Sequence, residues 1–372
     1  MCTVTQLYGL ESGVPGPTPL DGLNCPPFGM GTGRRFSGQV LGYSDTGIPY
    51  QAFDYDSSTF GAYGAVGAMR IPVSLPPFFA SLPTNPRPGV VGFQVPNDAG
   101  LLLVTEDESF GWAVVEHLLP SLTAFARRRP LDIAIDGDSL TVQQIPTGAP
   151  AVHAYMNDLA VVAQAVAAAA GPLSRFQRPK VPGLSFYGRP DWAYLPRDDR
   201  ILATAPVTRG RGSRTSDLVV SPSSGGVQTV GFTHSFEVTV SSGDSQSTRT
   251  DHEYVTQTSL PFQFGRVAVD WRGFAAPLIF HLPEFDDSHT VYADDRPFAT
   301  EVCRPLLRWL ASMNPPPFAI QGGYVWMRPP TKPDIEAVEW CHRFVLEFFA
   351  RVSHKVWHHL GLPGNPVGVS LR

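Results

Sequence analysis

The chain has 372 residues, of which 43% are hydrophobic and 16% are charged, a balance typical of a globular protein and not of a disordered one. Its formal net charge is −5 at pH 7. This disfavours nucleic acid as a partner, because proteins that bind nucleic acids usually carry a strongly basic surface. At about 100 to 200 residues per domain, this length predicts two domains.

The first third of the chain predicts an antiparallel meander after a lead-in rich in Gly and Pro. Residues 1–33 form that lead-in, with one short helical turn expected at Val4–Tyr8. From Arg34 onwards, the segments RRFSGQVLGY, IPYQAFDYD and MRIPVSL are rich in β-branched and aromatic residues and are separated by turn residues. Residues 57–68 are expected to form a flexible loop, and residues 76–96 a Pro-rich connection.

A pattern that begins at Leu103 occurs a second time near the end of the chain. The first copy extends to Val142 and the second spans residues 290–327, with Phe110 falling on Phe298 when the copies are superposed. In each copy an acidic turn begins a helix, and a run that contains Pro ends it. Two short apolar runs around a Gly then predict a hairpin. We therefore expect a tandem repeat.

A second helix completes each copy, over residues 151–170 in the first and 335–357 in the second. The predicted fold class is α+β, as two tandem repeats that are each an antiparallel sheet packed with about two main helices. The expected domains are residues 1–171, which hold the first repeat, a basic linker at 172–190, and a second repeat at 191–372. The linker mixes Arg and Lys with aromatic residues, which can bind acidic partners, but the wide spacing of the charges favours an ordinary connector.

Part of the first repeat resembles a family of actinobacterial proteins of unknown function. The resemblance is carried by PPFGMGTGRRFSGQV, by the PYQAFDYD that follows, and by the later helix and IAIDGDSL segment. It covers Pro26 to Val142, as a pattern of PFG, then RR, then FDY. The second repeat has no FDY and reads VAVDW at the corresponding place, Val267–Trp271. The resemblance implies a fold and a lineage, and no activity.

The candidate catalytic residues lie in the second repeat, outside any familiar catalytic motif. The sequence lacks the Walker and dinucleotide phosphate loops, the GxSxG nucleophile motif and the HExxH zinc motif. The candidate catalytic residues are His234, His252, His281 and Asp286. If alternate strand residues point to one face, these side chains can meet as a metal site or an acid/base pair. The alternative, which their irregular spacing favours, is that they are separate surface and turn residues.

The last predicted helix carries the candidate metal ligands His354 and His358. Their spacing of four residues can hold a transition metal, but no Asp, Glu or Cys joins them, which favours an exposed helix end whose imidazoles suit the helix dipole. No cofactor is predicted. The cysteines lack the paired spacing of zinc sites or disulfide frameworks, so we expect free thiols in a reducing cytoplasm; they are Cys2, Cys25, Cys303 and Cys341.

Two functions follow from these observations. The favoured function is a non-catalytic cytoplasmic scaffold or protein-binding protein with a protein partner, because the two repeats share no set of polar residues that would indicate a duplicated active site. The alternative is a metal-dependent or acid/base hydrolase with its site in the second repeat. No transmembrane segment is expected, because the longest apolar run, Leu159–Ala170, is shorter than the roughly 18 to 20 residues of a membrane span. The sequence assigns no oligomeric state.

Overall fold

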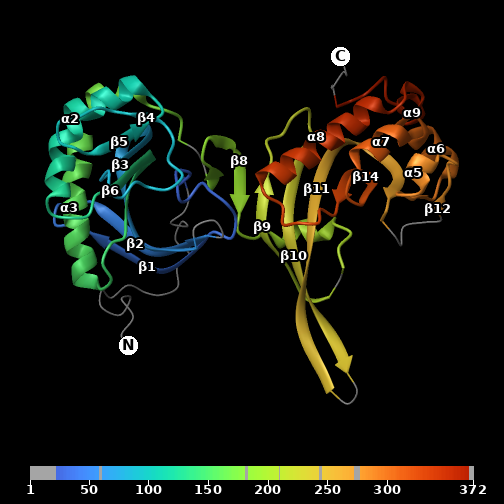
Figure 1. Ribbon diagram of the computed structural model, residues 1–372, viewed down its shortest axis with the longest axis horizontal. Coiled ribbons are helices and arrows are strands. Elements are labelled where there is room, and N and C mark those ends of the chain that lie inside the picture. Colours follow the sequence, from blue (N-terminus) through green and yellow to red (C-terminus); the bar gives the residue numbers. More distant parts are fainter. Residues whose placement is uncertain are drawn as a thin grey trace. The chain divides into compact units, whose positions relative to one another are not determined.

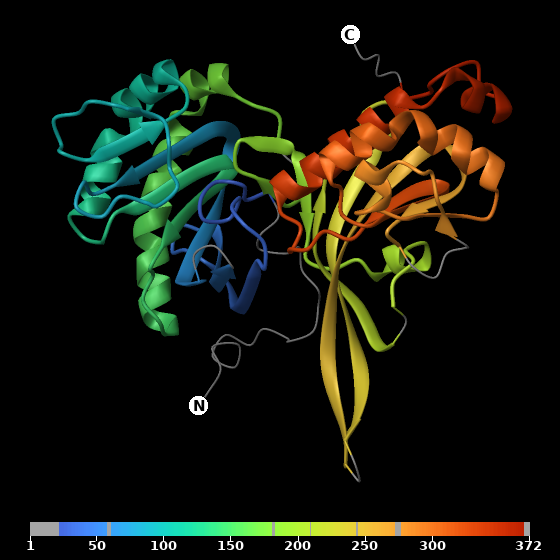
Figure 2. The same ribbon diagram turned by 45° about the vertical axis from the view of Figure 1, so that its right-hand side comes forward.

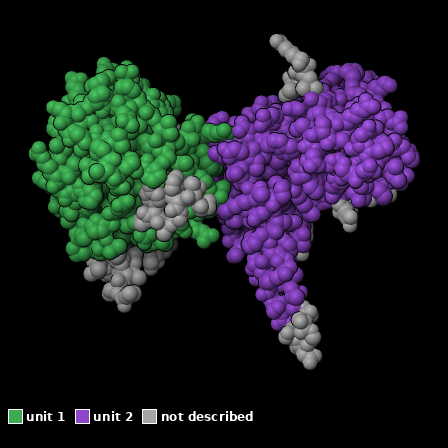
Figure 3. Space-filling model, in the orientation of Figure 1, with its two compact units in different colours: residues 1–190 green, residues 191–372 purple. Residues whose placement is uncertain are grey.

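The chain divides into two compact units, Met1–Pro190 and Asp191–Arg372 (Figure 3). The computed structural model describes residues 22–57, 61–180, 183–208, 210–242, 245–271 and 277–367. Antiparallel sheets combine with helices throughout, which confirms the predicted α+β class. Residues 172–190, predicted to be a linker, belong to unit 1. The helical turn expected at Val4–Tyr8 lies outside the described residues.

Unit 1 is built on a meander whose central strand is long and bent. Its strands are β1 (Arg35–Tyr43), β2 (Pro49–Ser57), β3 (Gly61–Ser81), β4 (Phe93–Gln94), β5 (Leu102–Thr105) and β6 (Asp132–Gln143). The order is β1-β2-β3-β5-β4, and β6 also pairs with β3. The helices are α2 (Glu108–Ala126), α3 (Ala149–Ala168), α4 (Ala170–Leu173) and the 3₁₀ turn η1 (Ser174–Phe176). The two long helices pack against each other beside the sheet (Figure 1).

The second sheet contains eight strands in the order β12-β13-β11-β10-β9-β8-β7, with β14 also paired to β11. They are β7 (Ser185–Phe186), β8 (Arg189–Leu195), β9 (Arg211–Val220), β10 (Gln228–Ser242), β11 (Ser245–Val269), β12 (Pro277–Leu278), β13 (Val291–Ala293) and β14 (Phe318–Met327). The helical elements of unit 2 are η2 (Asp199–Ala203), α5 (Pro283–Asp286), α6 (Arg296–Cys303), η3 (Arg304–Leu306), α7 (Leu307–Met313), α8 (Ile335–Arg351) and α9 (His354–His359).

The two units share one strand topology. The order β1-β2-β3-β5-β4 with β6 on β3 in unit 1 corresponds to β9-β10-β11-β13-β12 with β14 on β11 in unit 2. The irregularities of the ladders also correspond. In unit 1 the β3–β6 register is interrupted on both sides of the Leu75–Gly137 pair, and in unit 2 the β11–β14 register is interrupted on both sides of the Phe264–Gly322 pair.

The helix that follows β5 and the helix that follows β13 begin in the same way. Asp107 caps α2 by accepting a hydrogen bond from the Phe110 N–H at 3.0 Å. Asp295 caps α6 by accepting one from the Phe298 N–H, also at 3.0 Å. An Asp at this position satisfies a free N–H of the first turn and also suits the helix dipole. The acidic turns predicted to begin these helices are therefore confirmed.

Three local predictions were wrong, and all concern strands that continue through Gly or Pro. Residues 61–68, expected in a loop, belong to β3, where Gly67 allows close packing because a Cβ there would lie 2.4 Å from the Met156 Sδ. Pro76 and Pro77 also belong to β3, beside its bulges, where a missing N–H is tolerated. The two predicted hairpins are the single strands β6 and β14, each with a left-handed Gly at the bulge.

No single helix within the described ranges is long and apolar enough to cross a membrane. One pair, Ala149–Ala168 with Ala170–Phe176, reaches that length and composition only when its two parts, bent by 69°, are taken together.

Candidate functional site

The register of β10 and β11 decides where the candidate histidines of unit 2 lie. His234 is opposite Glu253 in this ladder, and its Nδ1 lies 2.8 Å from the Glu253 Oε1. The same carboxylate accepts a hydrogen bond from the Thr208 N–H and lies 3.6 Å from the Arg328 guanidinium. His234 is fully buried, and its ring stacks on Phe236 with centroids 5.2 Å apart. The His234–Glu253 pair thus lies three residues before the point where β10 loses its pairing with β9.

His252 lies on the other face of the same two strands. It is opposite Ser235, the residue after His234, and its Nδ1 lies 2.8 Å from the Ser235 Oγ. Because successive side chains of a strand point to opposite faces, the sheet separates His252 from His234. The structure does not bring these two imidazoles together.

His281 lies in the loop just before α5, and Asp286 is the last residue of that helix. The Asp286 carboxylate accepts hydrogen bonds from the Phe280 N–H at 3.3 Å and the Leu282 N–H at 2.8 Å. It therefore holds the backbone on both sides of His281, which is exposed and has a φ of 58°. His281 lines a shallow hollow with Arg304 and Arg308. Asp286 is thus occupied in holding this loop.

His354 and His358 lie on the short helix α9, and both are exposed. Among the residues that the structure describes, no three His, Cys, Asp or Glu side chains are grouped so that they could hold a metal ion.

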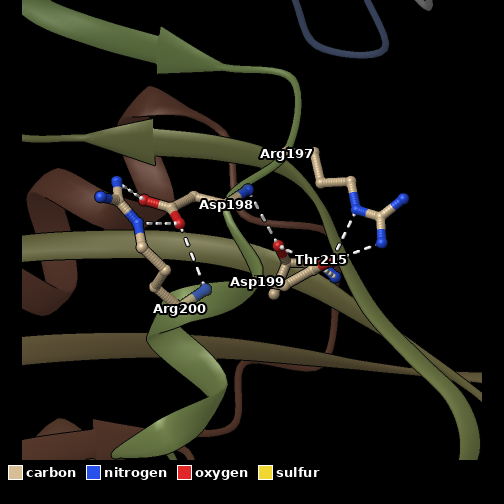
Figure 4. Close-up of polar contacts among 5 residues, drawn as sticks. All are labelled: Arg197, Asp198, Asp199, Arg200 and Thr215. Atoms are coloured by element: carbon tan, nitrogen blue, oxygen red, sulfur yellow. Dashed lines mark hydrogen bonds and ion pairs between the residues drawn. The ribbon is translucent and has the colours of Figure 1, made fainter.

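The charged residues at the start of unit 2 pair with one another (Figure 4). Arg200 lies 2.6 Å from Asp198, and Arg197 pairs in the same way with Asp199, which also accepts a hydrogen bond from the Thr215 N–H at 2.7 Å. The hydrogen bonds from Arg200 and Arg197 lower the pKa of Asp198 and of Asp199, respectively. Asp198 also caps η2. These charges therefore stabilise a turn.

The most distinctive part of unit 2 is the hairpin that β10 and β11 form. Strands β10 and β11 run on together beyond the rest of their sheet (Figure 1, Figure 2). Strand β9 pairs with β10 only as far as Glu237, and β14 pairs with β11 only from Thr256 onwards. We call residues 238–242 and 245–249 the arm. Among the described strands, only β10 and β11 pair with each other there.

The two faces of the arm differ in chemistry. On β10, Val238 and Val240 lie on one face, in line with Phe236, and Val240 is 38% exposed; β11 places Arg249 and Ser247 opposite these valines. Thr239, which lies between them, places its hydroxyl group on the other face, opposite Thr248. Val and Thr favour the extended backbone of a strand, so the sequence supports this hairpin without a core beneath it.

Comparison of the chain with family models, with curated proteins and with solved structures finds no match. The resemblance of residues 26–142 to an actinobacterial family therefore stays a prediction.

Proposed function

We propose that this protein is a non-catalytic protein-binding module whose arm binds an extended segment of a partner protein. The observation that carries this proposal is the outer edge of β10 from Val238 to Ser242, which no described strand covers. A free strand edge presents backbone N–H and C=O groups that can pair with another chain. Strand addition of this kind is a common mode of peptide recognition. The bound segment would lie beside β10 after Glu237, on the edge that β9 covers up to that residue.

The chemistry of the arm indicates what the bound segment contains. A strand added beside β10 would place every second side chain on the face that holds Val238 and Val240. We therefore expect apolar residues at alternate positions of the partner segment, paired across the strands with these valines. On the opposite face the partner would meet Thr239 and Glu237, and polar residues are expected there.

The energetics of the arm also support binding. An isolated two-stranded hairpin is only marginally stable in water, and the arm has neither a third strand nor a helix over it among the described residues. The exposed Val240 adds apolar surface that a partner can bury. A third strand would contribute both a hydrogen-bond ladder and apolar contact at the same place.

We also propose that the two units arose by duplication and that the arm was added to one of them. The shared strand order and the matching bulges support the duplication. Aligning the bulges places the Tyr50–Met69 pair of unit 1 on the Thr229–Thr258 pair of unit 2. Counting seven residues onward in each strand then places Ser57, the last residue of β2, on Phe236. The arm begins two residues later and has no counterpart in β2.

The proposal places the protein in the cytoplasm, and the cysteines support this location. Cys25, Cys303 and Cys341 are buried free thiols, as expected where a reducing environment keeps thiols unpaired. The alternative of a hydrolase has less support, because His234 and His252 bond to different groups on opposite faces of the sheet.

The test begins by identifying the partner. A photo-crosslinking residue, benzoylphenylalanine, is placed at Val240 in cells that make the protein, and at the exposed Val161 of α3 as a control. We expect a discrete adduct from position 240 and none from position 161. A second probe at Val238 should also give the adduct, and this adduct should disappear when residues 239–248 are replaced by Asn-Gly, which keeps Val238 and joins it to the directly opposed Arg249 through a two-residue turn. An adduct with a second copy of the chain would show self-association and would contradict the proposal.

A pair of matched substitutions then tests the binding face with the purified partner. Val240→Asp should weaken binding at least tenfold, or by about 1.4 kcal/mol, because it places a charge in the apolar contact. Val161→Asp, on the exposed surface of α3 in unit 1, should leave the affinity nearly unchanged. Calorimetric titration measures both affinities. If both variants bind like the wild type, or if truncating the arm leaves binding intact, the arm is not the binding element.

A further inference from the structure

Unit 1 contains a cavity of about 340 Å³ that the proposed function does not use. It lies where the bulge of β6 meets the segment that follows η1. Its walls include Leu75 and Pro77 of β3, Gly137 of β6 and the ring of Tyr187. A cavity of this size and mainly apolar character, with a few polar groups, is typical of small-molecule sites.

Two polar side chains in the cavity wall have atoms without a hydrogen-bond partner. These atoms are the Asn24 Oδ1 and the Ser74 Oγ, and each residue is only 8% exposed. Roughly 90% or more of buried polar groups in folded proteins make a hydrogen bond, and leaving one unsatisfied costs about 1 to 3 kcal/mol. Both oxygens are therefore left to accept hydrogen bonds from a molecule in the cavity.

The carboxylates of the cavity are not equally neutralised. Asp138 lies 2.6 Å from the Lys180 ammonium and 2.5 Å from the Arg70 guanidinium. Asp136 is 5% exposed, and its Oδ2 accepts hydrogen bonds from the backbone N–H groups of Asn24 at 2.6 Å and Cys25 at 2.7 Å. No cation of the described residues pairs with it. Burial raises the pKa of Asp136, and the two backbone hydrogen bonds oppose that rise.

Unit 2 fills the corresponding place with a side chain. The matching bulges place Ser74, just before Leu75, at the position of Gln263, just before Phe264. A Cβ at Gly322 would lie 3.1 Å from the Gln263 Oε1, whereas a Cβ at Gly137 would lie 3.6 Å from the Ser74 Oγ. The shorter Ser side chain therefore leaves room in unit 1 that the Gln amide takes up in unit 2.

We propose that this cavity binds a small organic amine. The ammonium group pairs with Asp136 and donates hydrogen bonds to the Asn24 Oδ1 and the Ser74 Oγ, while an apolar body lies against Leu75, Pro77 and the ring of Tyr187. An amine fits this site because it supplies both the missing cation and the missing donors. A carboxylic acid would repel Asp136, and an alcohol would supply one donor and no charge.

The experiment compares matched probes on the full-length protein. Butylamine and phenethylamine, with the alcohol and the carboxylic acid of the same carbon skeletons, are titrated by calorimetry and by ligand-observed NMR. We expect at least one amine to bind at least tenfold more tightly than its alcohol, and the acids not to bind. The proposal is overturned if no amine binds at millimolar concentration, or if amines and alcohols bind equally. This comparison needs only the wild-type protein.

Two substitutions then locate the bound amine. Asp136→Asn keeps the shape of the side chain and removes its charge, so it should weaken amine binding at least tenfold while binding of the alcohol changes little. Ser74→Gln imports the residue of unit 2 and should abolish binding by filling the cavity. Gln263→Ser is the matched control in unit 2 and should leave the affinity unchanged. If Asp136→Asn and Ser74→Gln fold, as judged by circular dichroism, and still bind the amine like the wild type, the amine binds elsewhere.

Discussion

At the scale of single residues, the buried ion pair of unit 1 shows how one side chain can hold several segments together. The Arg87 guanidinium lies 2.6 Å from the Asp132 carboxylate of β6 and also donates to the Pro26 carbonyl at 3.1 Å. Arg87 is 5% exposed and Asp132 is 7% exposed. Removing one partner from such a pair leaves a buried charge without compensation, and this costs about 3 to 5 kcal/mol.

We therefore predict that Arg87→Met lowers the free energy of unfolding of unit 1 by about 3 kcal/mol or more. The double variant Arg87→Met, Asp132→Asn should lose less, because the unpaired charge is removed. Arg200→Met is the surface control and should have a far smaller effect, since the Arg200 side chain is 89% exposed in its pair with Asp198. Urea denaturation followed by circular dichroism measures all three. Equal losses from Arg87→Met and Arg200→Met would show that burial of the pair does not matter.

At the scale of the elements, close packing of α8 on its sheet depends on a glycine in β10. A Cβ on Gly231 would lie 2.4 Å from the Val338 Cγ2 and 2.6 Å from the Pro333 Cβ. Neither atom can move aside easily, because Val338 is fully buried on α8 and proline is rigid. The absence of a side chain at this position sets how near the helix lies to the strand.

Gly231→Ala should therefore destabilise unit 2 by about 1 to 3 kcal/mol, as expected for overpacking. Adding Val338→Ala should recover part of the loss if the clash is its cause. Gly171→Ala is the control, because a Cβ there would meet no atom within 4 Å, and it should be neutral or stabilising. Thermal unfolding of the purified variants measures these effects. A Gly231→Ala protein as stable as the wild type would mean that α8 can shift at little cost.

At the scale of the whole molecule, each unit has a hydrophobic core of its own. The core of unit 1 includes Leu118 and that of unit 2 includes Leu310, and both side chains are fully buried. A unit with its own core can unfold as a unit of its own. The arm and the amine cavity belong to different units, so the two proposed binding activities rest on separate cores.

We predict two thermal transitions in differential scanning calorimetry, one for each unit. Leu118→Ala and Leu310→Ala should each cost about 2 to 5 kcal/mol and should each shift a different transition to lower temperature. A small amine should raise only the transition that Leu118→Ala lowers, because a ligand stabilises the unit that binds it. A single transition that both substitutions shift equally would show that the units unfold together.

A feature of this fold can be predicted from the sequence when the residues that form it lie close together in the chain. The helix beginnings at Asp107 and Asp295 follow from a carboxylate within three residues of the N–H that it caps. The partner of His234 was within reach of sequence reasoning as well. Once Ser242 is placed opposite Ser245, counting back along the hairpin places His234 opposite Glu253. Without this register, the candidate residues cannot be sorted into those that share a face of the sheet and those that do not.

The sequence by itself determined the α+β class, the capped beginnings of the helices at Asp107 and Asp295, and the pattern that occurs twice, because these depend on periodicity and on contacts a few residues apart. Only the tertiary structure decided that the Gly-containing segments are single bulged strands, since this depends on pairing with β3 and β11. The position of the amine cavity also depends on the tertiary structure, because the backbone N–H of Asn24 bonds there to Asp136, 112 residues away. Contacts of that range arise from the packing of distant segments, and no local pattern encodes them.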